Sequence, residues 1–149
     1  MWVSYESSIL PMVLFYDSCE PVSESRHLYS YDHGVSIGSD MAFDRTASMA
    51  NVFTCDGDQV LDAVSVTTFS VSDARYTVQV YTDLTDPSDP TSGTTMLTSP
   101  KVGDIGPAGA YMIRIDDVHL TKGQTFSVVV TLESDGTVYV PLDTDEDET

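Results

Sequence analysis

Apolar and polar residues alternate along several short segments of this chain. In residues 76–81 every second side chain, beginning with Tyr76, lies on the more apolar face, which is the period of a half-buried strand. Residues 125–132 are mainly apolar, as is typical of a central strand. No window has the spacing of an amphipathic helix. We therefore expect strands near residues 10–16, 47–55, 59–69, 75–82, 94–98, 110–116, 125–132 and 137–142.

Turn-forming residues separate these segments, as they do in all-β domains built from short strands. The pattern predicts a single all-β domain, an antiparallel β-sandwich of jelly-roll-like type. Residues 18–46 are the exception, because they are polar and rich in turn residues. A loop of that length in a compact domain is usually functional or an insertion. Within it, residues 28–32 form the one ordered-looking piece, in which the tyrosines are expected to pack.

A stiff acidic loop, residues 82–93, follows the alternating segment 76–81. Pro87 and Pro90 bias the residues before them away from helical backbone angles, and Gly93 supplies a flexible position before the next strand. The prolines and serines account for the shape of the loop. Its aspartates have no partner base or nucleophile, so we expect no catalysis from it.

Net charge distinguishes this chain from an ordinary soluble domain. It has 149 residues, with 24 acidic and 6 basic side chains and a formal net charge of −18. Such a field repels phosphates and anionic lipids, so we expect no nucleic acid partner and no membrane insertion. The longest apolar run, residues 9–16, is shorter than the roughly 18 residues of a transmembrane helix, and it lacks the features of a signal peptide.

The two cysteines, Cys19 and Cys55, lie far apart in the sequence. Two alternatives remain open: one disulfide between them if the domain is secreted, or free buried thiols. Acidic residues flank both cysteines, which raises a thiol pKa rather than lowering it. Neither cysteine lies in the sequence context of a papain-like nucleophile. We therefore expect no enzymatic activity from the chain.

Several aspartates suggest a structural calcium site, because calcium is bound by carboxylate and carbonyl oxygens. The principal ligand candidates are Asp56, Asp58, Asp116 and Asp117, and the acidic loop offers a second series, Asp83, Asp86 and Asp89. The alternative is that the first pair belongs to an ordinary hairpin turn and that the loop aspartates are exposed caps. Bound calcium would raise the melting temperature.

Four segments occur in an order that resembles one protein family. They are LYSYD (28–32), ANVFTCDGDQVLDAVSVTT (50–68), YTVQVYTDLTDPSDPTSG (76–93) and LTKGQTFSVVVTL (120–132), the last followed by VYVPLD (138–143). Together they resemble the lectin-like domain found C-terminal to papain-like cysteine peptidase domains in secreted bacterial and archaeal proteins. The opening MWVSYES is similar to the last strand of a papain-like domain.

The resemblance implies a division of the chain and a function. Residues 1–11 would be a remnant of the preceding peptidase-domain strand or linker, residues 12–143 the lectin-like β-sandwich, and residues 144–149 an acidic disordered tail. The module would be a non-catalytic part of a secreted or cell-surface cysteine peptidase. Its partners would be the papain-like catalytic domain and a cell-surface glycan. The alternative is a purely structural spacer that binds no sugar.

Sugar binding requires exposed aromatic faces beside planar polar side chains. The aromatic candidates are Tyr29, Tyr31 and Tyr81, and their polar partners would be Asp32, His33 and Arg75. The alternative for each tyrosine is packing in the core or at a sheet edge.

Overall fold

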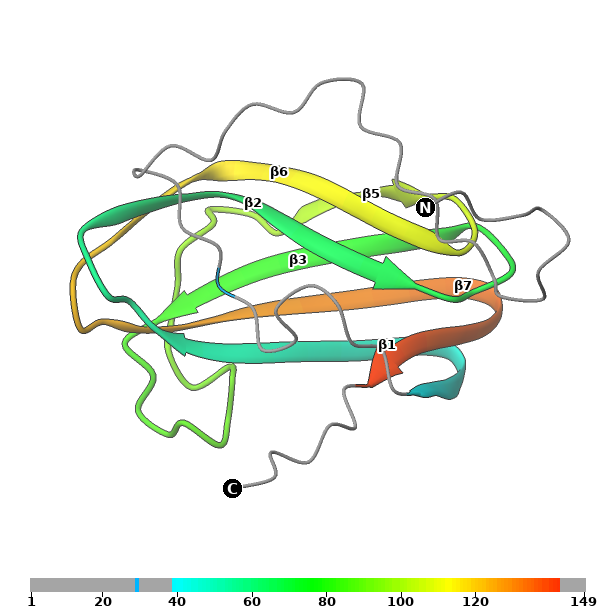
Figure 1. The fold of residues 1–149 in the computed structure, drawn as a ribbon, viewed down its shortest axis with the longest axis horizontal. Helices are drawn as coiled ribbons and strands as arrows, with labels where there is room; N and C mark the ends of the chain where they lie inside the picture. The colour runs from blue at the N-terminus through cyan, green and yellow to red at the C-terminus, as the bar shows by residue number, and fades with distance from the viewer. Residues whose placement is uncertain (1–28, 30–38, 143–149) are drawn as a thin grey trace, which may run out of the picture.

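The structure, a computed structural model, describes Tyr29 and residues 39–142. Every regular element in these ranges is a β-strand (Figure 1). In chain order the strands are β1 (Ser39–Thr54), β2 (Gln59–Thr68), β3 (Ala74–Thr82), β4 (Thr94–Thr95), β5 (Lys101–Ile105), β6 (Gly109–Leu120) and β7 (Thr125–Leu142).

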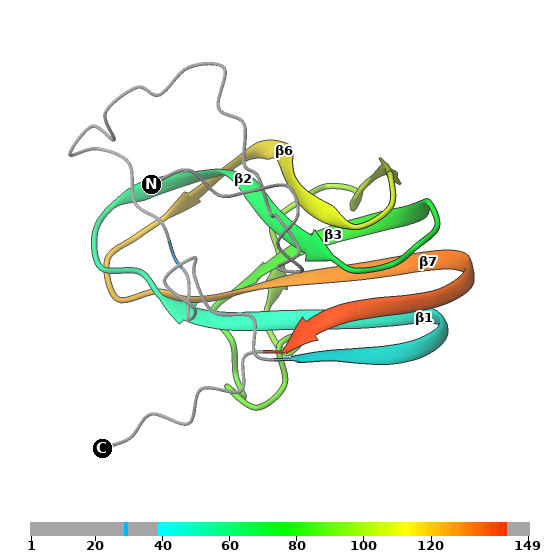
Figure 2. The same cartoon turned by 45° about the vertical axis from the view of Figure 1, so that its right-hand side comes forward.

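Two antiparallel sheets form the two layers of the domain (Figures 1 and 2). The larger sheet has the strand order β1-β7-β3-β4, and β5 also pairs with β3. The smaller sheet consists of β2 and β6 in the part of the chain that the structure describes. The expected antiparallel β-sandwich is therefore confirmed.

The core lies between the sheets, on the side to which alternate residues of β3 and β7 point. Val78 pairs with Val130 and Thr82 pairs with Phe126, so even-numbered side chains of both strands share the inner face. The smaller sheet contributes buried aliphatic residues to the same core: Val64, Val66, Ile113, Ile115, Val118 and Leu120. The alternation in the sequence is thus the alternation between core and surface.

An irregularity in β6 keeps the apolar side chains of this long strand pointing toward the core. Ile115 and Val118 are buried, whereas Asp116 and Asp117 between them are both exposed. The pairing register with β2 shifts at this point. The bulge moves the buried positions from odd to even numbers. The strand therefore continues to Leu120, beyond its predicted end.

One bulged strand, β7, replaces the two strands predicted near residues 125–132 and 137–142. Residues 134–136, which read as a turn in the sequence, lie opposite Arg45 alone, where the pairing with β1 is irregular. Arg45 has a φ of 62°, a left-handed conformation that costs energy for a residue with a side chain. The turn residues bend the ladder but do not end the strand.

The prediction of a loop over residues 18–46 is wrong for residues 39–46, because β1 begins at Ser39. This part of β1 is an edge strand that pairs with the end of β7. Exposed side chains such as Asp40, Met41 and Ala42 face solvent on both sides there. Burial therefore imposes no clean alternation, which is the signal that the prediction needed.

Other predicted boundaries differ from the structure in smaller ways. The strand expected near residues 94–98 is limited to β4, and β5 was not predicted, because its short polar sequence has no regular alternation. The strand expected near residues 10–16 lies outside the described residues, as do the predicted linker, residues 1–11, and the predicted tail, residues 144–149.

The acidic loop and the chain that follows it cover part of the outer face of the larger sheet. Ser127 on β7 is fully buried and donates a hydrogen bond to the carbonyl of Pro90. Gln79 on β3 is only 9% exposed. Its side chain donates to the carbonyl of Leu97 at 3.3 Å and accepts from the Leu97 N–H at 3.2 Å. Polar side chains of the sheet are therefore paired with the loop backbone, which satisfies groups that would be costly to bury alone.

Candidate functional site

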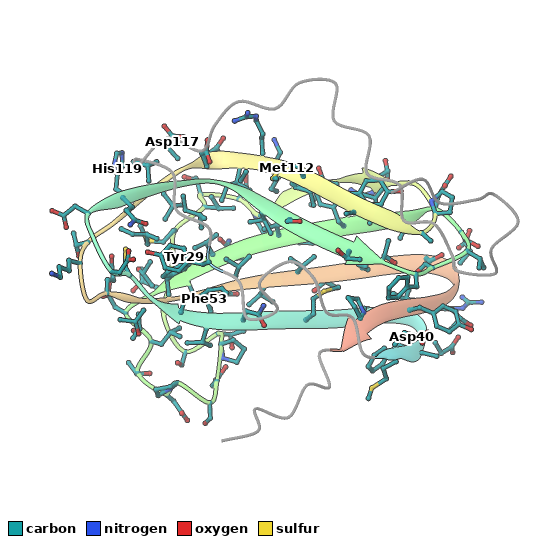
Figure 3. All side chains as sticks on the ribbon, in the orientation of Figure 1. Tyr29, Asp40, Phe53, Met112, Asp117 and His119 are labelled. Carbon is teal, nitrogen blue, oxygen red and sulfur yellow. The ribbon has the colours of Figure 1, made fainter. Side chains whose placement is uncertain are left out.

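Tyr29 packs into one end of the sandwich (Figure 3). Its ring centroid lies 5.6 Å from that of Phe53 on β1 and 5.1 Å from that of Phe126 on β7, the latter contact being edge-to-face. Its hydroxyl oxygen lies 2.9 Å from Gln59 Oε1 and 3.0 Å from Asp56 Oδ1. Such aromatic contacts stabilise beyond the area that they bury. Both the ring and the hydroxyl therefore hold Tyr29 at the turn between β1 and β2.

The phenol of Tyr29 stays protonated at neutral pH. Burial, followed by the hydrogen bond to the Cys55 thiol, raises the pKa of Tyr29 above its ordinary value. The neutral hydroxyl can donate to Gln59 or Asp56 while it accepts from the N–H of Asp56 at 3.3 Å. The ring of Tyr29 therefore packs against other side chains of the domain, and its role in stacking on sugar stays a prediction.

Cys55 carries a free thiol and is buried, with 1% of its surface exposed. The thiol donates a hydrogen bond to the carbonyl of Gly57 at 2.8 Å and lies 3.4 Å from the hydroxyl of Tyr29. Of the two alternatives for the cysteines, the structure therefore has the free buried thiol at Cys55. Cys19 lies outside the described residues, and counting thiols in the denatured, non-reduced protein tests the pairing.

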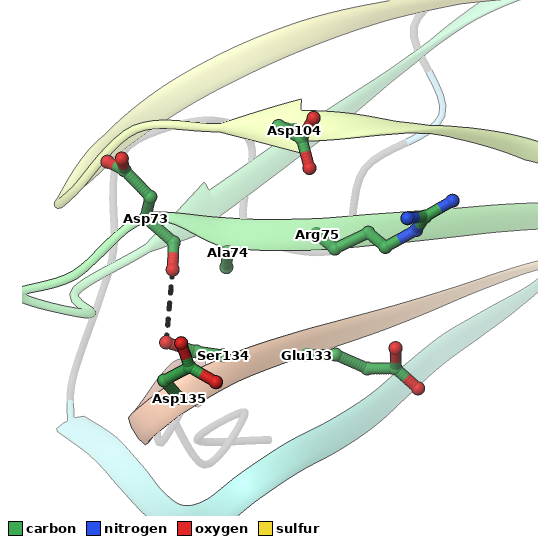
Figure 4. Close-up of a pocket in the computed structure, with 7 residues that line it drawn as sticks. All are labelled: Asp73, Ala74, Arg75, Asp104, Glu133, Ser134 and Asp135. Carbon is green, nitrogen blue, oxygen red and sulfur yellow. Dashed lines mark hydrogen bonds between the residues drawn. The ribbon is translucent and has the colours of Figure 1, made fainter.

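A hollow of about 550 Å³ opens where β3, β5 and β7 lie side by side (Figure 4). Arg75 is the basic residue of its lining, and we call it the Arg75 hollow. The strand register places Arg75 opposite Asp104 on β5 and opposite Glu133 on β7. The hydroxyl of Ser134 donates to the carbonyl of Asp73 at 3.0 Å and closes one end. The lining thus combines four carboxylates with one guanidinium and contains no aromatic side chain.

The described sugar-binding candidates lie on different faces of the larger sheet. Tyr29 contacts Phe126 from the inner face. Tyr81 and Arg75 have odd numbers on β3 and lie on the outer face, where Tyr81 pairs with Ser127 and is half-buried. The structure therefore does not bring these three candidates into one site. Tyr31, Asp32 and His33 lie outside the described residues.

The principal calcium candidates are not brought together either. Asp58 accepts a hydrogen bond from the N–H of Lys122 at 3.0 Å, and Asp56 bonds the side chain of Gln59 at 2.7 Å. Asp116 and Asp117 form the bulge of β6. Among the described residues, no three His, Cys, Asp or Glu side chains come close enough to hold a metal ion. Calcium binding stays a prediction, which melting curves with and without millimolar calcium would test.

The loop aspartates act as local caps. Asp86 accepts hydrogen bonds from the hydroxyl and the N–H of Ser88, at 2.6 and 2.9 Å. Asp89 does the same for Thr91, at 2.7 and 2.9 Å. Asp83 accepts from the side chain of Gln124 at both of its oxygens and from the hydroxyl of Thr82 at 3.3 Å. Each carboxylate therefore accepts hydrogen bonds from nearby groups of the fold, and calcium binding by this series stays a prediction.

A second hollow, of about 360 Å³, lies beside the turn that holds Tyr29. It is lined by Asp58, Gln59, Val60, His119, Leu120 and Thr121, and we call it the His119 hollow. Val60 and His119 are paired across β2 and β6, and Val60 is 47% exposed. Sequence reasoning missed this hollow, because the register between the two strands cannot be read from either strand alone.

A family comparison decides the identity of the fold. A model of the lectin-like domain family matches residues 28–149. The chain belongs to the lectin-like domain family. This confirms the resemblance found in the sequence. No curated protein matches the chain.

Solved structures with the same fold come from a peptidase. The chain is similar to the clostridial cysteine protease Cwp84 after propeptide cleavage, with 21% identity and a TM-score of 0.57 over 76% of this chain and 28% of that one. It is also similar to the cysteine protease and lectin-like domains of Cwp84, a surface layer associated protein of Clostridium difficile, with 20% identity and a TM-score of 0.54 over 72% of this chain and 26% of that one. In those proteins the lectin-like domain is joined to a cysteine protease domain. In the described part of this lectin-like chain, no helix is long and apolar enough to cross a membrane.

Proposed function

We propose that this lectin-like domain is a non-catalytic accessory module of a secreted or cell-surface cysteine peptidase and that it positions the catalytic domain. The observation that carries the proposal is the family match over residues 28–149, together with a fold shared with structures in which such a domain is joined to a cysteine protease. The chain spans 28% of the first of these structures, so a catalytic domain would lie elsewhere in the same polypeptide.

The chemistry of Cys55 supports a non-catalytic role. A cysteine nucleophile needs an accessible thiolate and a neighbouring base. Cys55 is 1% exposed, and its proton is donated to the carbonyl of Gly57.

The test compares the full polypeptide with a variant that lacks residues 28–149. If the module positions the peptidase, the deletion variant should hydrolyse a small peptide with an unchanged kcat/KM. Its cleavage of proteins on the cell surface should fall at least about tenfold, which corresponds to the loss of roughly 1.4 kcal/mol of productive interaction. A variant that loses both activities equally would contradict the proposal, because the module would then be part of the catalytic unit.

Carbohydrate binding at the Arg75 hollow is a second candidate function. Its support is a recess of about 550 Å³ lined by charged side chains and Ser134, since carboxylates and guanidinium groups can bond sugar hydroxyls. Titration of the chain with cell-wall polysaccharide should give binding that Arg75→Ala abolishes. Arg114→Ala is the matched control, because Arg114 is exposed and pairs only with Asp62 among the described residues, at 3.3 Å. Equal binding by both variants would exclude the hollow.

A further inference from the structure

The sequence contains two Asp-Gly pairs, Asp56-Gly57 and Asp135-Gly136. In such a pair the backbone nitrogen of the glycine can attack the side-chain carboxyl carbon of the aspartate, because glycine has no side chain to obstruct the approach. A five-membered succinimide forms, and the carboxyl hydroxyl and the amide proton leave together as water. Water then opens the ring at either of its two carbonyl carbons, which restores aspartate or gives isoaspartate. The reaction needs no co-reactant other than water, but it needs a backbone that can rotate.

The first pair, Asp56-Gly57, lies in the turn between β1 and β2, outside both strands. Asp56 is exposed, and no described residue accepts a hydrogen bond from the N–H of Gly57. The glycine is not crowded, since a Cβ atom there would meet its nearest neighbour, Nε2 of Gln59, at 3.5 Å. The same Nε2 donates to Oδ1 of Asp56 at 2.7 Å, and it would stabilise the negative charge that develops on this oxygen during the attack. The attacking nitrogen is thus available, and the carboxyl group has a donor.

The second pair, Asp135-Gly136, lies inside β7, next to Ser134 (Figure 4). The N–H of Gly136 donates to the hydroxyl of Ser134 at 3.3 Å. On both sides of the pair the strand is bonded to β1, through Glu133 before it and Thr137 after it. The backbone rotation that the reaction requires would disrupt this pairing, so the strand must open locally before the second pair can react.

We propose that Asp56-Gly57 is a site of spontaneous isoaspartate formation and that the modification releases Cys55 and Tyr29 from the turn. Isoaspartate carries the main chain through its Cβ and Cγ atoms, so the turn gains one backbone atom. The former carboxyl group, whose Oδ1 lies 3.0 Å from the hydroxyl of Tyr29, becomes part of the peptide bond. The carbonyl of Gly57, which accepts from the thiol of Cys55 at 2.8 Å, is displaced with it. The buried thiol thereby loses its acceptor and becomes accessible.

Peptide mapping of the 149-residue chain after prolonged incubation in mildly acidic buffer tests the proposal. Trypsin cuts after Arg45, Arg75 and Lys122, so the two Asp-Gly pairs lie in different peptides. In the folded chain, isoaspartate located by electron-transfer fragmentation should form at least about tenfold faster at residue 56 than at residue 135, because β7 must open before the second pair reacts. In the chain unfolded by urea the difference should largely disappear. Equal rates in the folded chain, or a faster reaction at residue 135, would overturn the proposal.

Two variants and one thiol measurement extend the test. Gly57→Ala should slow isoaspartate formation at residue 56, because the added methyl group obstructs the attack, whereas Gly136→Ala should leave that rate unchanged. Cys55 is 1% exposed, so in the native chain iodoacetamide should alkylate it only in molecules that carry isoaspartate at residue 56. Both changes are read in the same tryptic peptide, since Cys55 and Asp56 are neighbours. Peptides that contain isoaspartate but an unalkylated Cys55 would overturn the release of the turn.

Discussion

The hydroxyl of Ser127, a fully buried residue of β7, donates a hydrogen bond to the carbonyl of Pro90 in the acidic loop. The two residues are far apart in the sequence, and the bond fastens the loop to the outer face of the larger sheet. The loop is therefore part of the folded domain. Its prolines set the direction of the backbone, and a side chain of the sheet fixes its position.

Replacing Ser127 by alanine should lower the free energy of unfolding by about 1–3 kcal/mol, because the carbonyl of Pro90 would be left without its donor. In a domain of this size that loss corresponds to a decrease in melting temperature of about 2–4 °C per kcal/mol. Thermal denaturation followed by circular dichroism measures it. Ser48→Ala is the control: Ser48 is exposed and bonds only the hydroxyl of Thr131 among the described residues, at 2.8 Å. Equal losses in the two variants would contradict this account.

Gly93 should not tolerate a side chain. A Cβ atom there would lie 2.3 Å from the carbonyl oxygen of Thr82 and 2.9 Å from the side chain of Leu84. Because backbone must move to relieve the first contact, Gly93→Ala should destabilise the domain by about 1–3 kcal/mol. At Gly57 the nearest atom, on Gln59, is 3.5 Å away, so Gly57→Ala should change the stability far less. Chemical denaturation of both variants measures the difference in their free energies of unfolding. If Gly93→Ala were as stable as the unchanged protein, the loop would be free to rearrange around the added side chain.

Strand positions could be predicted where one face of a strand is buried. Residues 76–81 alternate because Val78 and Val80 pack in the core, and the same reasoning identified β2 and most of β6. The edge strand β1 escaped detection over its first residues, since solvent on both sides removes the periodic signal. The bulges at Asp116 and near Arg45 were also missed. A bulge depends on the partner strand, and the pattern of one segment does not contain that information.

The candidate sites were harder to predict than the fold. The aspartates and tyrosines were selected as residues whose chemistry allows metal binding or stacking, but their positions depend on sheet register. Register places Arg75 between Asp104 and Glu133 and leaves Tyr29 on the other face of the sheet. The Arg75 hollow and the His119 hollow each combine residues from different strands. Composition gave the charge of the surface, and only the three-dimensional arrangement shows where that charge gathers.

The hydroxyl of Tyr29 should stabilise the domain in a way that depends on pH. Tyr29→Phe keeps the ring contacts and should cost about 1 kcal/mol, the net value of an ordinary hydrogen bond. The folded-state pKa of Tyr29 is raised, so its contribution is fully present below the pKa of an unfolded tyrosine, about 10, and is lost as the pH rises above that value. Urea denaturation at pH 8 and pH 11 should therefore show a smaller difference between the two proteins at the higher pH. A stability difference between the two proteins that grows with pH would contradict the hydrogen bonds assigned to the Tyr29 hydroxyl.

The carboxyl group of Asp86 reports on the turn inside the acidic loop. Hydrogen bonds from the hydroxyl of Ser88 and then from its N–H lower the pKa of Asp86 below its ordinary value. Ser88→Ala removes the stronger of these bonds, so carbon-detected NMR titration should find the pKa of Asp86 raised toward that of a free aspartate. Thr91→Ala, which removes the equivalent bond to Asp89, should leave the pKa of Asp86 unchanged. A group whose pKa is lowered by folding stabilises above its unfolded pKa and ceases to do so as the pH falls through the folded value. The contribution of the Asp86 carboxylate to the turn should therefore be lost in acid. A titration of Asp86 that Ser88→Ala does not alter would show that the hydroxyl bond does not form in solution.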